Sequence, residues 1–179
     1  MSKDPVPLKA VHHIEFWVGN AKQASYFYRN AFGFNQIAYS GLETGNRDRA
    51  SYVLEQGKIR MIFSTPLHSN NGISEHIKNH GDGVKDIAFH VDDAKGCYDA
   101  CIARGAKSAQ KPETLSDKNG SVTKAAIYTY GETIHSFISH NDYNGPFLPG
   151  FQESKIDGDS VGLRFIDHVV GNVELGKME

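Results

Sequence analysis

A strand-like pattern that occurs twice is the feature that most restricts the folds open to this chain. Residues 13–18 read HIEFWV and residues 86–91, which lie 73 positions later, read DIAFHV, so Ile, Phe and Val recur in matching places. In both copies these apolar residues alternate with other residues, which is typical of a half-buried β-strand. A repeat of this kind predicts two copies of one unit of secondary structure.

The first copy predicts a unit of one strand, one helix and three further strands. Asn20 has the side chain of a helix cap, apolar residues recur at helical spacing over 21–32, and Gly33 can take the left-handed conformation that ends a helix. The predicted strands of this unit are 11–18, 34–41, 49–56 and 59–66.

The second copy follows a connector, 67–83, which contains a short predicted helix at 74–80. Asp92 and Asp93 then precede a second amphipathic helix, which is expected to end at Gly105. The predicted strands of the second unit are 86–91, 107–115, 122–130 and 133–139.

The two cysteines of the chain, Cys97 and Cys101, lie four residues apart on the second predicted helix. A disulfide between them would strain the helix, and a metal site would need ligands from other segments. We therefore interpret both as small apolar core residues.

We predict an α+β fold of paired βαβββ units, each with its helix on one face of a four-stranded sheet and its other face cupped around a shared cavity. The predicted domain covers 11–141, with units 11–66 and 84–141, and a linker follows at 142–164. Residues 165–179 are expected to begin a second domain of the same kind, with RFIDHVVGN as its first strand. The residues expected to pack the linker down are Tyr143, Phe147 and Phe151.

Composition limits the classes of partner. Hydrophobic residues make up 39%, charged residues 22%, and the net charge is −2, which indicates neither disorder nor a nucleic-acid-binding surface. No apolar stretch approaches the roughly 20 residues that span a bilayer, and the N-terminus lacks the apolar region of a signal peptide. We expect a cytoplasmic protein with a small-molecule partner, no nucleic acid and no membrane.

Strand alternation places several polar side chains in the predicted cup. His13 and Glu15 should face away from the helix, as should Asp86 and His90 of the second unit. The residues from which an independent metal site remains possible are His13, Glu15, Asp86, His90 and His135. The alternative is a polar, solvated cup that braces another domain. We interpret His12 and His13 as structural, and the segments RDR (47–49) and EHIKNH (75–80) as solvated surface.

Several phrases of the sequence carry a resemblance. The paired units resemble the vicinal oxygen chelate (glyoxalase-like) fold. The phrases that resemble the N-terminal half of the 4-hydroxyphenylpyruvate dioxygenase family, over residues 11–172, are FWVGNAKQASYFY, GLETGNR, HGDGVKDIAF, TYGETIHSFI, PFLPGF and FIDHVVGN. The likeness is specific because it consists of several phrases in order.

The resemblance implies an enzyme with a non-haem Fe(II) held by two histidines and one glutamate, which leaves positions open for a 2-oxo acid and dioxygen. It places the first histidine at His168 and the other two ligands beyond Glu179. The implied reaction converts 4-hydroxyphenylpyruvate and O2 to homogentisate and CO2 in tyrosine and phenylalanine catabolism. A homodimer or larger assembly is also implied.

The same resemblance makes this chain a fragment with no catalytic residue and one iron ligand, and we expect it to be inactive alone. In the N-terminal cup the positions equivalent to ligands would hold His13, Asp86 and Phe137, and because phenylalanine cannot ligate a metal, this site looks decayed. Strand alternation would turn Asp167 away from His168. The alternatives are hydroxymandelate synthase, a sister enzyme, and a non-catalytic vicinal oxygen chelate module that binds a small ligand or a partner subunit.

Overall fold

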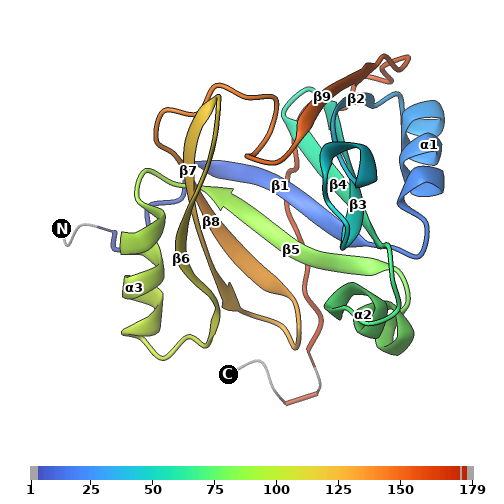
Figure 1. Cartoon of the computed structure of the whole chain (residues 1–179). Helices are drawn as coiled ribbons and strands as arrows, with labels where there is room; N and C mark the ends of the chain where they lie inside the picture. The colour runs from blue at the N-terminus through green and yellow to red at the C-terminus, as the bar shows by residue number, and fades with distance from the viewer. Residues whose placement is uncertain (1–3, 174, 177–179) are drawn as a thin grey trace.

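One mixed sheet of nine strands runs through the molecule (Figure 1). The computed structural model describes residues 4–173 and 175–176. The strands are β1 (Ala10–Trp17), β2 (Asn35–Ser40), β3 (Arg49–Gln56), β4 (Ile59–Pro66), β5 (Gly83–His90), β6 (Ser108–Asp117), β7 (Gly120–Tyr128), β8 (Ile134–His140) and β9 (Gln152–Ile156). Their order across the sheet is β6-β7-β8-β5-β1-β4-β3-β2-β9.

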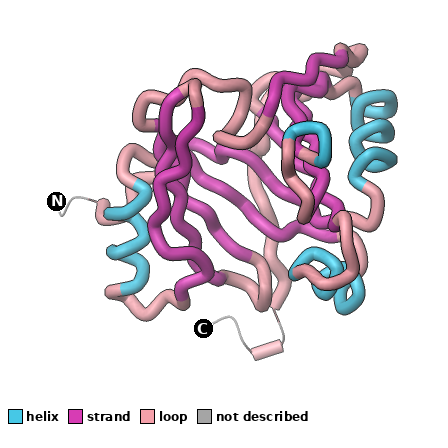
Figure 2. The backbone as a smooth tube through the Cα atoms, in the orientation of Figure 1, coloured by secondary structure: helices cyan, strands magenta, loops and turns pink. Residues whose placement is uncertain are grey.

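The strand pairing divides most of the sheet into two equivalent halves. In the first half β1 pairs in parallel with β4, and β4, β3 and β2 continue as antiparallel neighbours. In the second half β5 pairs in parallel with β8, followed by β7 and β6. The halves meet where β1 and β5 pair antiparallel, with Ile14 opposite Ile87. The predicted pair of βαβββ units is therefore confirmed (Figure 2).

Two helices cover the two halves of one face of the sheet. Helix α1 (Ala21–Phe32) has the predicted bounds, since Asn20 Oδ1 accepts a hydrogen bond from the Gln23 amide and Gly33 has φ of 68°. Helix α3 (Ala94–Ile102) packs Cys97 against Phe137 in an apolar cluster, which confirms the core interpretation of that cysteine.

Two shorter helical segments lie in the connections. Helix α2 (Gly72–His80), between the two units, agrees with the predicted short helix, and a 3-10 turn, η1 (Leu42–Thr44), follows β2. No helix in the described part of the chain is long and apolar enough to cross a membrane.

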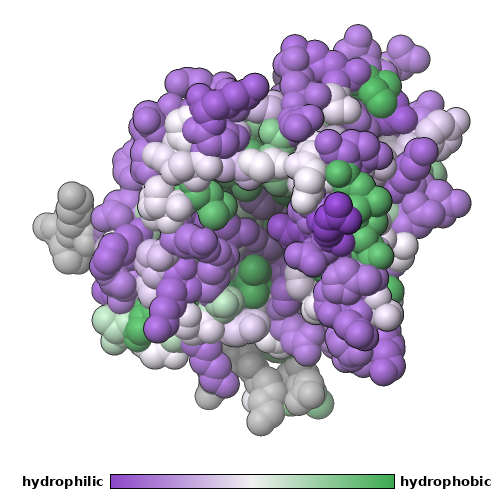
Figure 3. All heavy atoms as spheres, viewed as in Figure 1, coloured by the Kyte–Doolittle hydropathy of each residue, from purple (hydrophilic) through white to green (hydrophobic). Residues whose placement is uncertain are grey.

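The other face of the sheet forms the cup, and residues after β8 fill one part of it. The cup cluster consists of Ala38, Val53, Ile62, Ala88, Val122, Ile138, Tyr143, Phe147 and Leu148. Its last three members come from the predicted linker, so the expectation that Tyr143 and Phe147 pack the linker down is confirmed. Figure 3, from the same side as Figure 1, shows this face hollowed near its centre.

The predicted linker contains a strand that the sequence did not suggest. Strand β9 pairs antiparallel with β2 and becomes an edge of the sheet. The residues that follow turn back, with the Lys58 amide donating to the Arg164 carbonyl.

The predicted strand RFIDHVVGN (164–172) is wrong, because these residues have no regular secondary structure. Residues 166–172 lie against the helix-bearing face of the sheet, beside Ile87 and Phe89, and appear behind the sheet in Figure 1. A segment that crosses the face of a sheet has no neighbouring strand edge with which its backbone can form hydrogen bonds, so it does not become a strand. Residues 174 and 177–179 of the predicted second domain lie outside the described residues.

Candidate functional site

Two buried carboxylates lie opposite each other at the centre of the cup. Glu15 and Asp86 are partners in the β1–β5 register and are 7% and 0% exposed. Glu15 Oε1 accepts hydrogen bonds from Ser64 Oγ at 2.7 Å and from Arg49 Nη1 at 3.3 Å. The interpretation of residues 47–49 as solvated surface is therefore wrong for Arg49, which donates to the buried Glu15 carboxylate. The charged residues at 47–49 did not indicate this partner, because Glu15 lies on a strand 34 residues earlier.

Asp86 is held by the second unit. Its Oδ1 accepts from the Ser136 amide at 3.0 Å, its Oδ2 accepts from Ser136 Oγ, and Lys124 Nζ lies 3.6 Å from Oδ2. Both carboxylates thus have internal partners, which is how buried charges are usually stabilised.

The two carboxylates differ in their pKa shifts. Burial would raise the pKa of Glu15, but Arg49, Lys124 and the Ser64 hydrogen bond outweigh burial and lower it. Burial raises the pKa of Asp86, and Lys124 and Ser136 offset only part of that effect. The opposite shifts arise because Glu15 has the stronger cationic support.

Three histidines form a connected group at another part of the cup. His12 Nδ1 lies 2.6 Å from His13 Nδ1, and His12 Nε2 lies 2.8 Å from His140 Nε2. Burial lowers the pKa of His12 to about 2, with Arg60 as the next cause, and burial also lowers the pKa of His13 well below its ordinary value. His12 and His13 are therefore neutral and buried, in agreement with the structural interpretation.

Phe147 closes the cup over these histidines. Its side chain is 3% exposed, and its ring centroid lies 5.3 Å from that of His13 and 5.7 Å from that of His12. The Arg60 guanidinium lies 5.8 Å from the same ring. This part of the cup is thus filled by the protein's own chain and is not a solvated surface.

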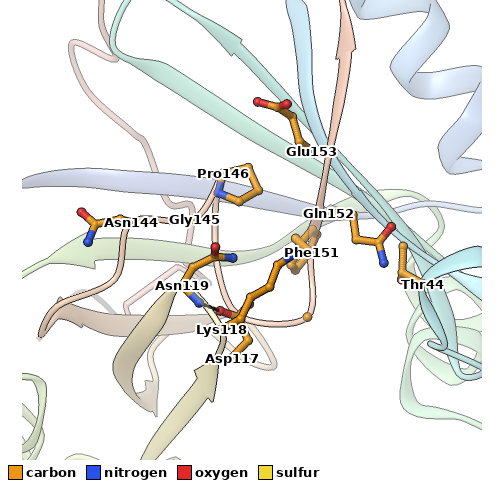
Figure 4. A pocket seen from close by; sticks show the side chains of 11 residues that line it. Thr44, Asp117, Lys118, Asn119, Asn144, Gly145, Pro146, Phe151, Gln152 and Glu153 are labelled. Carbon is orange, nitrogen blue, oxygen red and sulfur yellow. Dashed lines mark hydrogen bonds between the residues drawn. The ribbon is translucent and has the colours of Figure 1, made fainter.

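An open groove of about 890 Å³ lies beside the segment that carries Phe147 (Figure 4). The β6–β7 turn contributes Lys118 and Asn119, residues 144–146 and 150–153 line another side, and Thr44 lies beside Gln152. The lining combines amide side chains and glycines with the charged residues Asp117, Lys118 and Glu153, and none of the cup carboxylates or histidines reaches it.

The five residues considered for an independent metal site do not come together. His13, Glu15 and Asp86 belong to the cup, whereas His135 lines a cavity on the opposite face and its Nδ1 contacts the Ile87 carbonyl oxygen at 3.1 Å. Within the described ranges, no group of three possible ligands includes any of the five.

The expectation that Phe137 faces the cup is wrong. Phe137 packs with Cys97 and Ala125 under α3, and Ser136 occupies the cup position and binds Asp86. The prediction chose the neighbouring residue of β8. Because successive side chains of a strand point to opposite faces, an offset of one residue exchanges the two faces.

His168 lies on the helix-bearing face, away from the cup. It lines a cavity of about 560 Å³ together with Phe89 and His135, and its side chain is 74% exposed. Its Nδ1 lies 2.8 Å from Asp167 Oδ2, so the prediction that these side chains point apart is wrong. Strand alternation does not apply to them because the segment is not a strand.

One group of possible metal ligands was missed by the sequence analysis. His76, His80 and Glu132 each offer an atom within 4.8 Å of the other two, and no other such group occurs among the residues that the structure describes. Burial lowers the pKa of His76, and His80 and Lys85 lower it further. The spacing of four between the histidines on a predicted helix could have indicated a shared face, but Glu132 is distant in sequence.

Comparison with known proteins adds family information to this geometry. Residues 2–147 match the family described as "Hydroxyphenylpyruvate dioxygenase, HPPD, N-terminal". The chain is 44% identical to 4-hydroxyphenylpyruvate dioxygenase of Neurospora crassa, over 93% of this chain and 46% of that protein. It is 47% identical to the enzyme of the same name from Dictyostelium discoideum, over 92% of this chain and 47% of that protein.

A solved structure gives the same fold. A triple mutant of 4-hydroxymandelate synthase from Streptomyces coelicolor matches with a TM-score of 0.73 and 25% identity, over 84% of this chain and 42% of that chain. The fold is therefore that of the vicinal oxygen chelate proteins. The chain spans about half the length of the curated relatives it matches.

Proposed function

Since the chain belongs to the hydroxyphenylpyruvate dioxygenase family, we propose that it takes part in the Fe(II)-dependent conversion of 4-hydroxyphenylpyruvate and O2 to homogentisate and CO2. The observation that carries this proposal is identity of 44% and 47% to two such dioxygenases over more than nine-tenths of the chain. Because the chain spans about half of those proteins, the activity is proposed for a whole protein that also contains a catalytic domain. The proposed division is a domain at 11–141, a linker at 142–164 and the start of the catalytic domain from 165.

His168 is the residue of this chain that we propose as an iron ligand. Asp167 occupies its Nδ1, which leaves Nε2 as the nitrogen that would hold the metal. A carboxylate on the second ring nitrogen is a common support of metal-binding histidines, because it fixes the tautomer and the ring orientation. The residues present thus fit one position of an iron site, and the other two ligands would come from the catalytic domain. When bound, the iron supplies the site for the 2-oxo acid and for activation of dioxygen.

The N-terminal domain has a supporting role in this proposal. Glu15 and Asp86 are committed to Ser64, Ser136 and basic side chains, and Phe147 covers the histidine group. These contacts stabilise a folded scaffold and commit both cup carboxylates to internal partners. A cytoplasmic location and a homodimer or larger assembly, both expected from the resemblance and the composition, belong to the same proposal.

The test is to express the whole open reading frame and to measure oxygen uptake and product with 4-hydroxyphenylpyruvate. We expect homogentisate, and we expect His168→Ala to lose iron and turnover while keeping the fold. His68→Ala is the matched control, because His68 is also exposed and near an aspartate, with Nε2 3.2 Å from Asp48 Oδ1. The 179-residue chain alone should show no turnover.

Two results would replace this proposal. Formation of 4-hydroxymandelate would identify the sister activity, although the higher identity to the dioxygenases favours homogentisate. A whole protein without iron or turnover would instead support a non-catalytic binding module of the same fold.

A further inference from the structure

A second cluster of ligand-type side chains lies where α2 meets the turn between β7 and β8. His76 and His80 are separated by one turn of α2, so their side chains lie on the same face of that helix. Glu132, from the turn, places its Oε2 3.2 Å from His80 Nε2 and 3.6 Å from His76 Nδ1. The cluster joins the connector between the two units to the last hairpin of the second unit.

His76 is unusual because its polar atoms have no partner. The side chain is 6% exposed, and neither ring nitrogen has a hydrogen bond or access to solvent. Its Nδ1 is directed at Glu132 but is too far away for a hydrogen bond. A buried imidazole without partners destabilises a fold unless another ligand satisfies it.

The separations between the ligand atoms suit a small metal ion. Ligands at 2.0–2.1 Å from a tetrahedral metal lie roughly 3.3 Å from one another. The two separations that involve Glu132, 3.2 and 3.6 Å, are close to that value, and the remaining pair lies within 4.8 Å. His80 and Glu132 are 49% and 56% exposed, so both can adjust toward an ion held by the fixed His76.

The donor set decides the class of ion. Two imidazole nitrogens and one carboxylate favour divalent first-row transition metals, whereas Mg²⁺ and Ca²⁺ prefer oxygen ligands throughout. We propose that His76, His80 and Glu132 bind one such ion, with Zn²⁺ as the representative metal. The fourth position faces the exposed side of the cluster and is available to water.

Neighbouring side chains hold the cluster in place. Lys85 Nζ donates to the main-chain oxygen of Glu132, which positions the turn, and lies 4.8 Å from the centroid of the Trp17 ring. The Trp17 ring packs edge-on against His76, with 5.2 Å between centroids. The ammonium of Lys85 opposes a cation, so the net attraction depends on the Glu132 charge.

The experiment is a zinc titration of the EDTA-treated 179-residue chain by calorimetry, with Co²⁺ absorption as a second measure of coordination. We expect one ion per chain and a d–d spectrum of a nitrogen-oxygen site. His80→Ala removes a ligand nitrogen and Glu132→Gln removes the carboxylate charge, so each should weaken binding by at least the roughly 10–100-fold typical of losing a group that only supports a ligand. These side chains are exposed, so circular dichroism should show an unchanged fold.

The control is His68→Ala, which removes an exposed histidine outside the cluster and should leave zinc binding unchanged. The proposal is overturned if the unmodified chain binds no zinc, if binding survives both cluster variants, or if the control abolishes it. None of these outcomes depends on dioxygenase activity.

Discussion

Replacement of Phe147 by alanine should reduce the stability of the chain more than any exposed aromatic replacement. Phe147 comes from the predicted linker, but it is 3% exposed and lies in the cup cluster. A truncation of a buried phenylalanine to alanine costs about 3–5 kcal/mol, because apolar contact is lost and a cavity remains.

The contacts of Phe147 place the expected loss in the upper half of that range. The ring lies within 5.7 Å of the His12 and His13 rings and 4.9 Å from the Phe151 ring, measured between centroids. Aromatic pairs of this kind add about 0.5–1.5 kcal/mol beyond the area that they bury. We therefore expect the free energy of unfolding to fall by about 4–5 kcal/mol, or the midpoint temperature by about 8–20 °C for a chain of this size.

The assay is urea unfolding followed by fluorescence and far-ultraviolet circular dichroism, with agreement of the two probes as the test of a single transition. Phe165→Ala is the matched control, since the same atoms are removed from a side chain that is 61% exposed. Its free energy of unfolding should change by no more than about 0.5 kcal/mol. Equal losses in the two variants would refute the role given to Phe147.

Two further predictions concern buried polar groups. His12 has a pKa of about 2 in the folded chain and near 6.5 when unfolded. Between these pH values the unfolded state binds more protons than the folded state, so the free energy of unfolding should fall as the pH drops. His12 by itself contributes an expected loss of about 1.4 kcal/mol per pH unit below 6.5, and the lowered pKa of His13 adds to this slope. The measurement is the urea midpoint as a function of pH. A flat profile in the unmodified chain, or the same slope in His12→Gln as in His168→Gln, would contradict the role given to the burial of His12. Ser64→Ala removes a donor to the buried Glu15 carboxylate and should cost about 1.5–3 kcal/mol. Exposed Ser69→Ala is its control, and a loss as small as that of the control would show that Glu15 does not need the hydroxyl.

Local patterns in the sequence predicted much of the fold. The bounds of α1 follow from Asn20 and Gly33, whose capping roles depend only on the residues next to them. Strand β9 could not be predicted in this way, because its stability depends on the edge of β2, more than a hundred residues earlier. The strand expected after residue 164 had the right composition but lies against a sheet face, where its backbone has no ladder to join.

The site was predicted less completely than the fold. Alternation placed Glu15 and Asp86 correctly in the cup, because they are direct partners and the next register shift between β1 and β5 comes only after Glu15. It failed for Phe137, where the face depends on a register that the sequence alone does not fix. The cluster of His76, His80 and Glu132 was missed because 52 residues separate its carboxylate from the nearer histidine, as the His80–Glu132 contact records.

The register at the centre of the sheet has a consequence for the evolution of the two halves. Ile14 and Ile87 are 73 residues apart, the period of the repeat, and they are also direct partners across the β1–β5 seam. An internal two-fold axis therefore passes between them. On one side of the axis Glu15 faces Asp86, and at the symmetry-related place His13 faces Ala88. The duplicated backbone has kept its symmetry while the side chains at this seam have diverged, so a substitution in one half is not equivalent to its counterpart in the other.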